Sequence, residues 1–164
     1  MSIANRLADH LKKIRLIVTD FDGVWTDGKV TVSSDGTESV VCSRKDTLRI
    51  PEIEAAGIRI FVLSKEVSNV VALRCQKMGV EYLHGVDDKL FRLKGIIEHC
   101  GIKAEEVMFV GDDVNDLECL RHVGLPVTVA DGDPECKGAS VFVTRRRGGD
   151  HAMREVFDLV LSLR

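Results

Sequence analysis

Acidic or hydroxyl-bearing residues stand directly after three short apolar segments of this sequence. Asp20 and Asp22 follow the first segment, Ser64 follows the second, and Asp112 and Asp113 follow the third. If these segments are parallel strands, their carboxyl ends meet at one edge of a sheet, where open α/β sheets bind ligands. Carboxylates gathered there repel one another, and an oxygen-preferring cation removes that cost. The spacing therefore predicts a Mg²⁺ site held by Asp20, Asp22, Asp112 and Asp113.

The same edge could carry out phosphoryl transfer. We predict that Asp20 is the nucleophile, which attacks phosphorus to form an aspartyl-phosphate. Asp22 lies two residues further along an extended chain, on the same side, and suits a general acid that later activates water as a base. Ser64 can hydrogen-bond the phosphoryl oxygens, and Lys89, at a predicted helix start, can neutralise their charge and hold Asp20. Hydrolysis and transfer to another acceptor would use the same residues, so both stay open.

The segments around these residues predict the elements that position them. Short β-branched segments, apolar on consecutive positions, alternate with segments whose apolar residues have helical spacing, which is typical of a parallel sheet covered on both faces. The sequence therefore predicts an α/β fold with a doubly wound, Rossmann-like parallel sheet, as a single domain over residues 1–164. The predicted strands are Arg15–Thr19, Ile58–Leu63, Val107–Val110, Pro126–Val129 and Val141–Val143, and the predicted helices are a lead-in over Met1–Lys13, then Val67–Met78, Lys89–Cys100, Asn115–His122 and Ala152–Leu163.

One segment departs from the alternation of strands and helices. Lys29–Val32 and Glu38–Cys42 alternate polar and apolar residues on either side of Ser34-Asp35-Gly36, a turn sequence. This pattern predicts a β-hairpin flap over about residues 28–43, directly after the first strand. We expect the flap to overhang the carboxyl ends of the sheet.

Composition and charge exclude several classes of protein. The chain has 164 residues, of which 45% are hydrophobic and 30% charged, as in a soluble globular protein. A formal net charge of -3 argues against nucleic acid and anionic membranes as partners. No apolar run is long enough for a membrane span, and no signal-peptide pattern is present. The five cysteines are odd in number and form no C-x-x-C pair, which argues against disulfides and zinc. We expect a cytoplasmic protein.

Together these features resemble the motifs of the haloacid dehalogenase superfamily. Within it, the sequence is similar to the capless branch that contains 3-deoxy-D-manno-octulosonate (KDO) 8-phosphate phosphatase, KDN 9-phosphate phosphatase and the C-terminal domain of animal CMP-sialic acid synthetase. The resemblance rests on the hairpin and on Asp20-Phe-Asp-Gly-Val-Trp-Thr-Asp-Gly28, Asp87-Asp-Lys-Leu90, Gly111-Asp-Asp-Val-Asn-Asp116 and Gly148-Gly149…Arg154-Glu155.

This resemblance implies an activity and an assembly. It implies a Mg²⁺-dependent phosphatase for a 2-keto-3-deoxy sugar acid phosphate with eight or nine carbons. It also implies a homotetramer in which the hairpins help to bring each active site near a subunit interface. A non-catalytic tetramerisation module is the alternative, although the intact charged residues argue against it.

The resemblance further implies substrate-binding residues. Glu66, with Lys77 one helix face away, looks more like the nine-carbon, sialic-acid-type group, although these two could form an ordinary surface ion pair. Asp46 is expected close to the mouth of the active site. Arg154 is expected to contact an anionic substrate across a subunit interface.

A few residues carry competing interpretations. Arg49 and His151 stand where the family commonly has glycine, so each changes backbone freedom or local volume. Asp113 and Asp116 could simply cap the following helix, where carboxylates meet the positive end of its dipole. The one basic run, Arg145-Arg146-Arg147, is expected to be a solvated loop.

Overall fold

A six-stranded parallel sheet forms the centre of the computed structural model, which describes residues 3–164 and the side chains from residue 7 onward. The strand order is β5-β4-β1-β6-β7-β8, so the first strand of the chain lies in the middle of the sheet. Every neighbouring pair is parallel, which places all carboxyl ends at one edge. The strands are β1 Leu16–Thr19, β4 Arg59–Leu63, β5 Glu81–Leu83, β6 Val107–Gly111, β7 Leu125–Thr128 and β8 Phe142–Val143.

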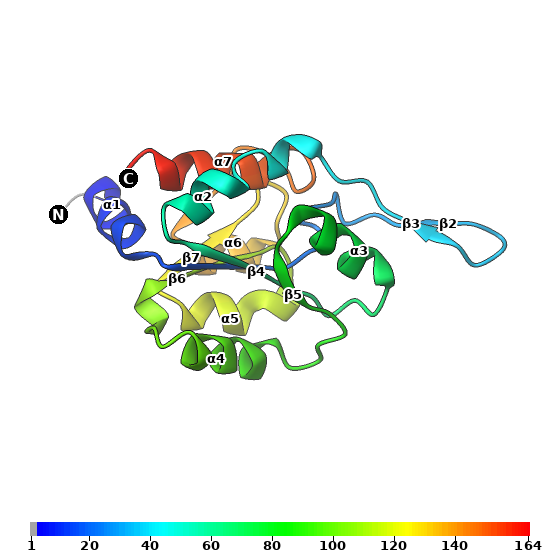
Figure 1. Ribbon diagram of the computed structural model, residues 1–164, viewed down its shortest axis with the longest axis horizontal. Helices are drawn as coiled ribbons and strands as arrows, with labels where there is room; N and C mark the ends of the chain where they lie inside the picture. Colours follow the sequence, from blue (N-terminus) through cyan, green and yellow to red (C-terminus); the bar gives the residue numbers. More distant parts are fainter. Residues whose placement is uncertain (1–2) are drawn as a thin grey trace.

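Helices cover both faces of the sheet (Figure 1). One face packs against α1 Ile3–Lys13, α2 Ile50–Ala55, α3 Asn69–Met78 and α7 Ala152–Leu161. The other face packs against α4 Lys89–His99, α5 Leu117–His122 and α6 Pro134–Ala139. The sheet is therefore doubly wound, as the sequence predicts, and the predicted fold is confirmed.

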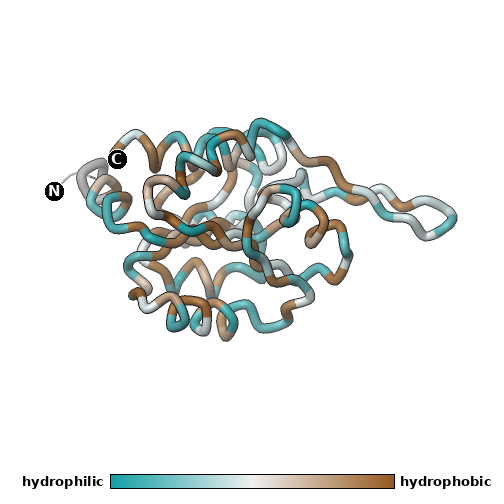
Figure 2. Tube along the Cα trace, in the orientation of Figure 1, coloured by the Kyte–Doolittle hydropathy of each residue, from teal (hydrophilic) through white to brown (hydrophobic). Residues whose placement is uncertain are grey.

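The two apolar cores follow from the consecutive apolar residues of the strands. In β1 the side chain of Ile17 belongs to the core beneath α2 and α7, whereas Leu16 and Val18 belong to the core above α4 and α5. Alternate side chains of a strand point to opposite faces, so a strand buried on both faces needs apolar residues at every position. Figure 2 shows this apolar band running through the middle of the molecule. Burial on both faces fixes the strand ends, and with them the residues that follow.

The predicted flap is a thin two-stranded hairpin. Its strands are β2 Thr31–Val32 and β3 Glu38–Ser39, which pair antiparallel. Thr26 and Cys42 form a further antiparallel bridge at its base. Figure 1 shows the hairpin projecting away from the body of the molecule, on the side opposite to both termini. A hairpin after the first strand is thus present as predicted, with shorter regular strands.

The remaining elements compare closely with the sequence-based expectations. Each of the five predicted strands lies within one residue of its predicted bounds, and the helices expected from residue 67 onward lie within two. The part of the predicted lead-in helix at Met1 and Ser2 lies outside the described residues. Among the described strands and α-helices outside the hairpin, β5, α2 and α6 were not predicted. Among the described residues, no helix has the length and apolar character that a membrane crossing requires. A 3-10 turn, η1 Arg44–Thr47, joins the hairpin to α2.

Candidate active site

Asp20 lies at the carboxyl end of the central strand and is almost completely buried. Its backbone N–H donates to the carbonyl of Val110 at 2.9 Å, which continues the β1–β6 ladder by one residue. Its carboxylate accepts a hydrogen bond from the N–H of Phe21 at 2.6 Å. The side chain is only 8% exposed. The strand therefore presents one fixed carboxylate at the edge where the sheet binds ligands.

Lys89 occupies the centre of a buried ion-pair network. Its Nζ lies 2.9 Å from Oδ2 of Asp20 and 2.7 Å from Oδ1 of Asp116. Asp88 caps the helix that Lys89 begins by accepting from the N–H of Phe91, so the lysine leaves the first turn of α4 in a fixed direction. Burial alone would lower the pKa of Lys89, but the carboxylates of Asp20 and Asp116 outweigh it and raise the pKa above its ordinary value. Lys89 is therefore a permanent cation beside Asp20.

Asp112 completes the cluster of carboxylates. Ligand atoms of Asp20, Asp112 and Asp116 all lie within 4.8 Å of one another. Oδ1 of Asp112 is buried and makes no hydrogen bond. Burial, followed by repulsion from Asp116 and Asp113, raises the pKa of Asp112 to about 7. Burial also raises the pKa of Asp20, with repulsion from Asp116 opposed by Lys89.

Glycine lets the loop after β1 approach Asp112. Gly23 has φ +84, and a Cβ at this position would collide with the carboxylate of Asp112. A side chain is excluded here both by the left-handed backbone and by the space it would need. An unsatisfied carboxylate oxygen, raised carboxyl pKa values and converging oxygen ligands together fit a small hard cation such as Mg²⁺.

Asp22 stands at the mouth of the site, more exposed than Asp20. Oγ1 of Thr26 lies 3.4 Å from Oδ1 of Asp22 and also accepts N–H bonds from Gly23 and Gly28. Thr26 thus fixes the turn on which Asp22 sits. Burial and the nearby Glu66 raise the pKa of Asp22, which suits a group that must hold a proton for part of a reaction.

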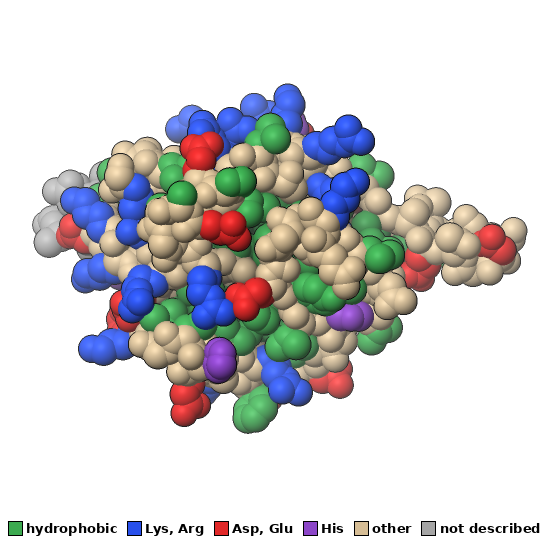
Figure 3. All heavy atoms as spheres, viewed as in Figure 1, with side chains coloured by type: hydrophobic (Ala, Val, Ile, Leu, Met, Phe, Trp, Pro, Cys, Tyr) green, Lys and Arg blue, Asp and Glu red, His purple; other side chains and the backbone are tan. Residues whose placement is uncertain are grey.

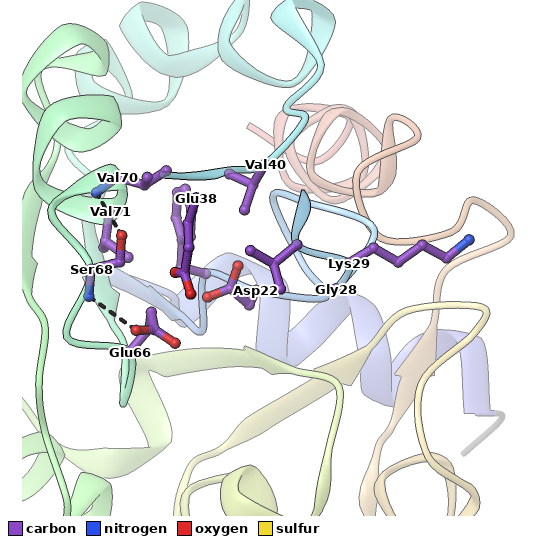
Figure 4. A pocket seen from close by; sticks show the side chains of 11 residues that line it. Asp22, Gly28, Lys29, Glu38, Val40, Glu66, Ser68, Val70 and Val71 are labelled. Atoms are coloured by element: carbon purple, nitrogen blue, oxygen red, sulfur yellow. Dashed lines mark hydrogen bonds between the residues drawn. The ribbon is translucent and has the colours of Figure 1, made fainter. Parts of the chain in front are cut away.

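Two neighbouring cavities, which share lining residues, open at this mouth. The first, of about 420 Å³, is lined by Asp20, Asp22, Ser64, Lys65, Glu66, Val67 and Asn115. The second, of about 200 Å³, shares Asp22 and Glu66 with the first and lies between the base of the hairpin and α3. Figure 4 shows Glu38 from the hairpin and Ser68 from the N-terminus of α3 facing this second space, with Val40, Val70 and Val71 beside them. The hairpin thus contributes side chains to the mouth within its own chain.

The structure brings together the four predicted catalytic residues, but not all of the predicted substrate residues. Asp20, Asp22, Ser64 and Glu66 line one cavity, and Lys89 lies behind it. Lys77 lies in the last turn of α3, at the opposite end of that helix from Glu66, about 12 Å along the axis from the first turn.

Asp46 and Arg154 contact each other instead of the cavity at Asp20. Asp46 is fully buried, and its Oδ1 accepts from the backbone N–H of Arg154 at 2.9 Å, which caps the first turn of α7. The Arg154 side chain pairs with Asp158 at 3.0 Å. Within one chain, both residues therefore organise the start of α7.

Arg49 and His151, the two positions where the resemblance leads us to expect glycine, differ in their backbone. His151 has φ 71 and is the one non-glycine residue with positive φ among residues 3–164. Arg49 has φ -95, an ordinary value, and its guanidinium pairs with Glu52 and Asp158. Only His151 therefore places a side chain in a conformation that favours glycine.

Asp116 is the residue whose role the sequence left undecided. Its carboxylate accepts from Lys89 and from the backbone N–H of Asp112 at 3.0 Å, so it joins the lysine to the carboxylate loop. Asp113, in contrast, is exposed and caps the following turn through the N–H of Val114. The spacing Asp112-x-x-x-Asp116 at a helix start could have indicated this, because one turn of helix returns the second carboxylate toward the first. Glu38 was missed because nothing in its local sequence shows which way the hairpin faces.

The fold and the site define an α/β protein of the haloacid dehalogenase type, with a central strand that ends in Asp-x-Asp and a buried lysine from a later helix. The family described as haloacid dehalogenase-like hydrolase matches residues 54–150, and the chain belongs to this family. The predicted superfamily and the prediction of a hydrolase are thus confirmed.

Individual relatives are more specific. The chain is 34% identical over 151 residues to 3-deoxy-D-manno-octulosonate 8-phosphate phosphatase of Escherichia coli K12, covering 92% of this chain and 80% of the relative. The crystal structure of the enzyme of that name from Moraxella catarrhalis, in complex with magnesium, phosphate and KDO, has a TM-score of 0.94 at 30% identity and covers 98% and 92% of the two chains. The cobalt-bound Haemophilus influenzae phosphatase has a TM-score of 0.89 at 30% identity, covering 94% and 91%.

Proposed function

We propose that this chain is a Mg²⁺-dependent phosphatase that hydrolyses a 2-keto-3-deoxy sugar acid phosphate through an aspartyl-phosphate on Asp20. The observation that carries the proposal is the buried cluster in which Lys89 holds Asp20 at 2.9 Å beside Asp112, whose Oδ1 is buried and has no hydrogen-bond partner. A purely structural tetramerisation module would have no use for this cluster, whose burial costs free energy. The relatives from Escherichia coli and Moraxella catarrhalis support the same class of substrate.

The residues of the chain supply the chemical steps. A carboxylate oxygen of Asp20 attacks phosphorus while the bond from phosphorus to the ester oxygen breaks, and Asp22 gives that oxygen its proton. Asp22 then removes a proton from water, whose oxygen attacks phosphorus and releases Asp20 and inorganic phosphate. Lys89 fixes Asp20 and offsets negative charge, and Ser64 is placed to hydrogen-bond phosphoryl oxygens.

Asp20 and Asp112 are the carboxylates best placed to hold Mg²⁺, which when bound would offset the charge of the phosphoryl group. Asp116 lies equally close, but its two oxygens already accept from Lys89 and from the N–H of Asp112. Asp22 as a ligand stays a prediction. So does Asp113, although its carboxylate is turned toward the N–H of Val114.

The mouth of the site favours a hydroxyl-rich leaving group. Glu66 and Glu38 both line the space next to Asp22, and two carboxylates would repel the carboxylate of a sugar acid at that place. The hydroxylated carbons next to the phosphate ester suit these acceptors, and the acid group has to lie further out. The implied roles of Glu66, Lys77, Asp46 and Arg154 toward the substrate stay proposals.

The decisive measurement compares Mg²⁺-dependent hydrolysis of KDO 8-phosphate and KDN 9-phosphate by the wild-type chain and by Asp20→Asn. We expect the variant to lose turnover by at least about a thousandfold, because an amide cannot form the phosphoenzyme. Asp9→Asn, a like change at an exposed position of α1, is the matched control and should keep full activity. Appreciable turnover by Asp20→Asn would remove Asp20 as nucleophile, and no turnover of any ester by wild type would favour the module.

We also propose that the hairpin joins subunits in a homotetramer. Val30, Val32 and Val41 are 52%, 62% and 75% exposed, which is unfavourable for apolar side chains on a projecting element unless another surface covers them. Light scattering coupled to size exclusion should give four chains for wild type and fewer for Val32→Asp. A monomeric wild-type chain would contradict this assembly. A cytoplasmic location stays a prediction.

A further inference from the structure

A third cavity lies on the outer side of α7, apart from the catalytic mouth. Its volume is about 700 Å³, and it shares no lining residue with the cavity at Asp20. Three segments form it: the η1 turn, the loop between β8 and α7, and the first turns of α7. We call it the α7 groove; its lining residues are Lys45, Leu48, Arg145, Arg146, His151, Arg154, Glu155 and Asp158.

Both carboxylates of the α7 groove are already engaged. The backbone N–H groups of Arg145 and Arg146 donate to the carboxylate of Glu155 at 3.0 and 2.9 Å, so Glu155 shapes the loop. Asp158 pairs with Arg154 and with Arg49, each at 3.0 Å. The negative charge that lines the groove is therefore used in holding the groove together.

Three of the four cationic side chains in the groove are not engaged in this way. Lys45, Arg145 and Arg146 form no ion pair with any side chain of residues 7–164, whereas Arg147, next in the run, pairs with Asp131 and lines another cavity. Figure 3 shows Lys and Arg side chains gathered along the edge formed by α7 and the segment before α2. The groove thus concentrates positive charge on a chain whose net charge is -3.

We propose that the α7 groove binds a small molecule that carries two or more phosphate groups. Its free cations come from two separate segments, η1 and the β8–α7 loop, so they match a ligand with more than one anionic group. Guanidinium groups bind phosphate through paired, charge-assisted hydrogen bonds, and two of the three free cations are arginines. Nucleic acid is a poorer match, because it needs an extended basic surface and a net charge of -3 repels it.

Glu155 makes the site more than a chance cluster of surface charges. By accepting from two successive backbone N–H groups, it sets the conformation of the loop that carries Arg145 and Arg146. The buried Asp46 likewise anchors η1, and therefore Lys45, against the N-terminus of α7. The backbone that presents the free cations is thus fixed before any ligand arrives, which lowers the entropy lost on binding.

Titration calorimetry of the full chain with sodium tripolyphosphate, in buffer without divalent metal, tests this proposal. We expect saturable binding near one equivalent per chain, weakened by at least about tenfold in the double variant Arg145→Gln, Arg146→Gln. The matched control is Arg92→Gln, Lys94→Gln, which removes the same charge from exposed positions of α4 on the other face of the sheet. Asp20→Asn should bind as wild type does, and hydrolysis of p-nitrophenyl phosphate should be the same in the Arg145, Arg146 variant as in wild type.

Several results would overturn the proposal. Equal affinity in wild type and in the Arg145, Arg146 variant would place binding elsewhere, and an equal loss in the α4 control would reduce it to net charge. Loss of binding in Asp20→Asn would assign the ligand to the catalytic mouth. If light scattering shows that the Arg145, Arg146 variant assembles differently from wild type, the groove is a contact between subunits.

Discussion

The cluster of Asp20, Lys89, Asp112 and Asp116 and the α7 groove differ in how their charged side chains are balanced. At Asp20, carboxylates converge on a buried lysine, and nearly every charged atom is held by a partner inside the protein. In the α7 groove, cations predominate, lie near solvent and are left partly without partners. Both lie beside the start of a helix, α4 in one case and α7 in the other.

This difference indicates whether a substitution in each region should mainly change the stability of the fold or the binding of a ligand. A buried charge that loses its partner stays desolvated, which costs several kcal/mol and also moves the groups it was holding. An exposed cation is screened by water and salt, so its loss changes the binding of a ligand more than the stability of the fold. The two regions should therefore respond very differently to substitutions of similar size.

Removal of the buried lysine should have the largest effect. In Lys89→Met the carboxylates of Asp20 and Asp116 would face each other without a cation, so we expect turnover to fall by about a thousandfold and the free energy of unfolding by about 3–5 kcal/mol. Phosphatase assays and urea denaturation measure the two quantities. Lys65→Met, an exposed lysine at the same mouth, is the control and should change stability by less than about 0.5 kcal/mol. Similar effects in both variants would contradict the network.

Asp116→Asn should have a smaller effect on the same cluster. The amide can still accept from one donor but no longer balances Lys89, so we expect turnover to fall by about ten- to a hundredfold and stability by about 2 kcal/mol. Asp113→Asn keeps its capping oxygen and should change both by little. If Asp113→Asn instead raises the Mg²⁺ concentration needed for half-maximal activity by tenfold, Asp113 is a metal ligand after all.

The pH dependence of stability should distinguish Asp46, beneath α7, from a surface carboxylate. Burial raises the pKa of Asp46 above the ordinary 3.8, so the native state binds its proton more tightly than the unfolded state does. The contribution of Asp46 is therefore greatest below pH 3.8 and is lost as the pH rises through the folded pKa. Relative to wild type, Asp46→Asn should therefore gain stability as the pH rises from about 4 toward neutrality, as measured by urea denaturation at a series of pH values.

Asp35→Asn provides the control for this pH series. Hydrogen bonds from Thr37 lower the pKa of Asp35, so its contribution to stability runs the other way and is lost as the pH falls. If the stability of Asp46→Asn relative to that of wild type does not change with pH, or falls as the pH rises, burial does not govern the Asp46 carboxyl.

The smallest effect should come from His151 at the rim of the α7 groove. A side chain at φ 71 destabilises the folded state by about 1 kcal/mol. Glycine removes this strain but loses more backbone entropy on folding, so we expect His151→Gly to stabilise the fold by only about 0.5 kcal/mol. Chemical denaturation measures this change. Ala152→Gly, one residue further into α7, should destabilise by about 1 kcal/mol or more. A destabilised His151→Gly variant would mean that the imidazole makes contacts that outweigh the backbone strain.

The sequence predicted best what depends on local pattern and on topology. Consecutive apolar residues indicated where the strands lie. Because the carboxyl ends of parallel strands share one edge of the sheet, topology alone predicted that Asp20, Ser64 and Asp112 lie close together. The strand β5 was not predicted because it has only three residues and begins with a glutamate at the edge of the sheet. The helices α2 and α6 were not predicted because each has only six residues and carries proline in its first turn.

The roles of single polar side chains were harder to predict. For Asp116, a carboxylate at a helix start suits capping and ion pairing equally well, and only the position of Lys89 decides between them. The resemblance implies substrate roles for Asp46 and Arg154, but it does not indicate the hydrogen bond between them, because the packing of α7 against η1 cannot be seen in either local sequence. Such contacts depend on the three-dimensional arrangement of distant segments.

The bond between Asp46 and Arg154 has a consequence for how the protein is made. It joins residues 108 positions apart, and the N–H of Gly149 similarly reaches back to the carbonyl of Val24 in the loop after the nucleophile. On the ribosome, the central strand and its catalytic loop emerge long before α7 does. The contacts between this loop and the segment around α7 can form only after α7 has been synthesised, since contacts so distant in sequence form slowly and late. The first catalytic residues to be translated should thus be among the last to reach their working positions.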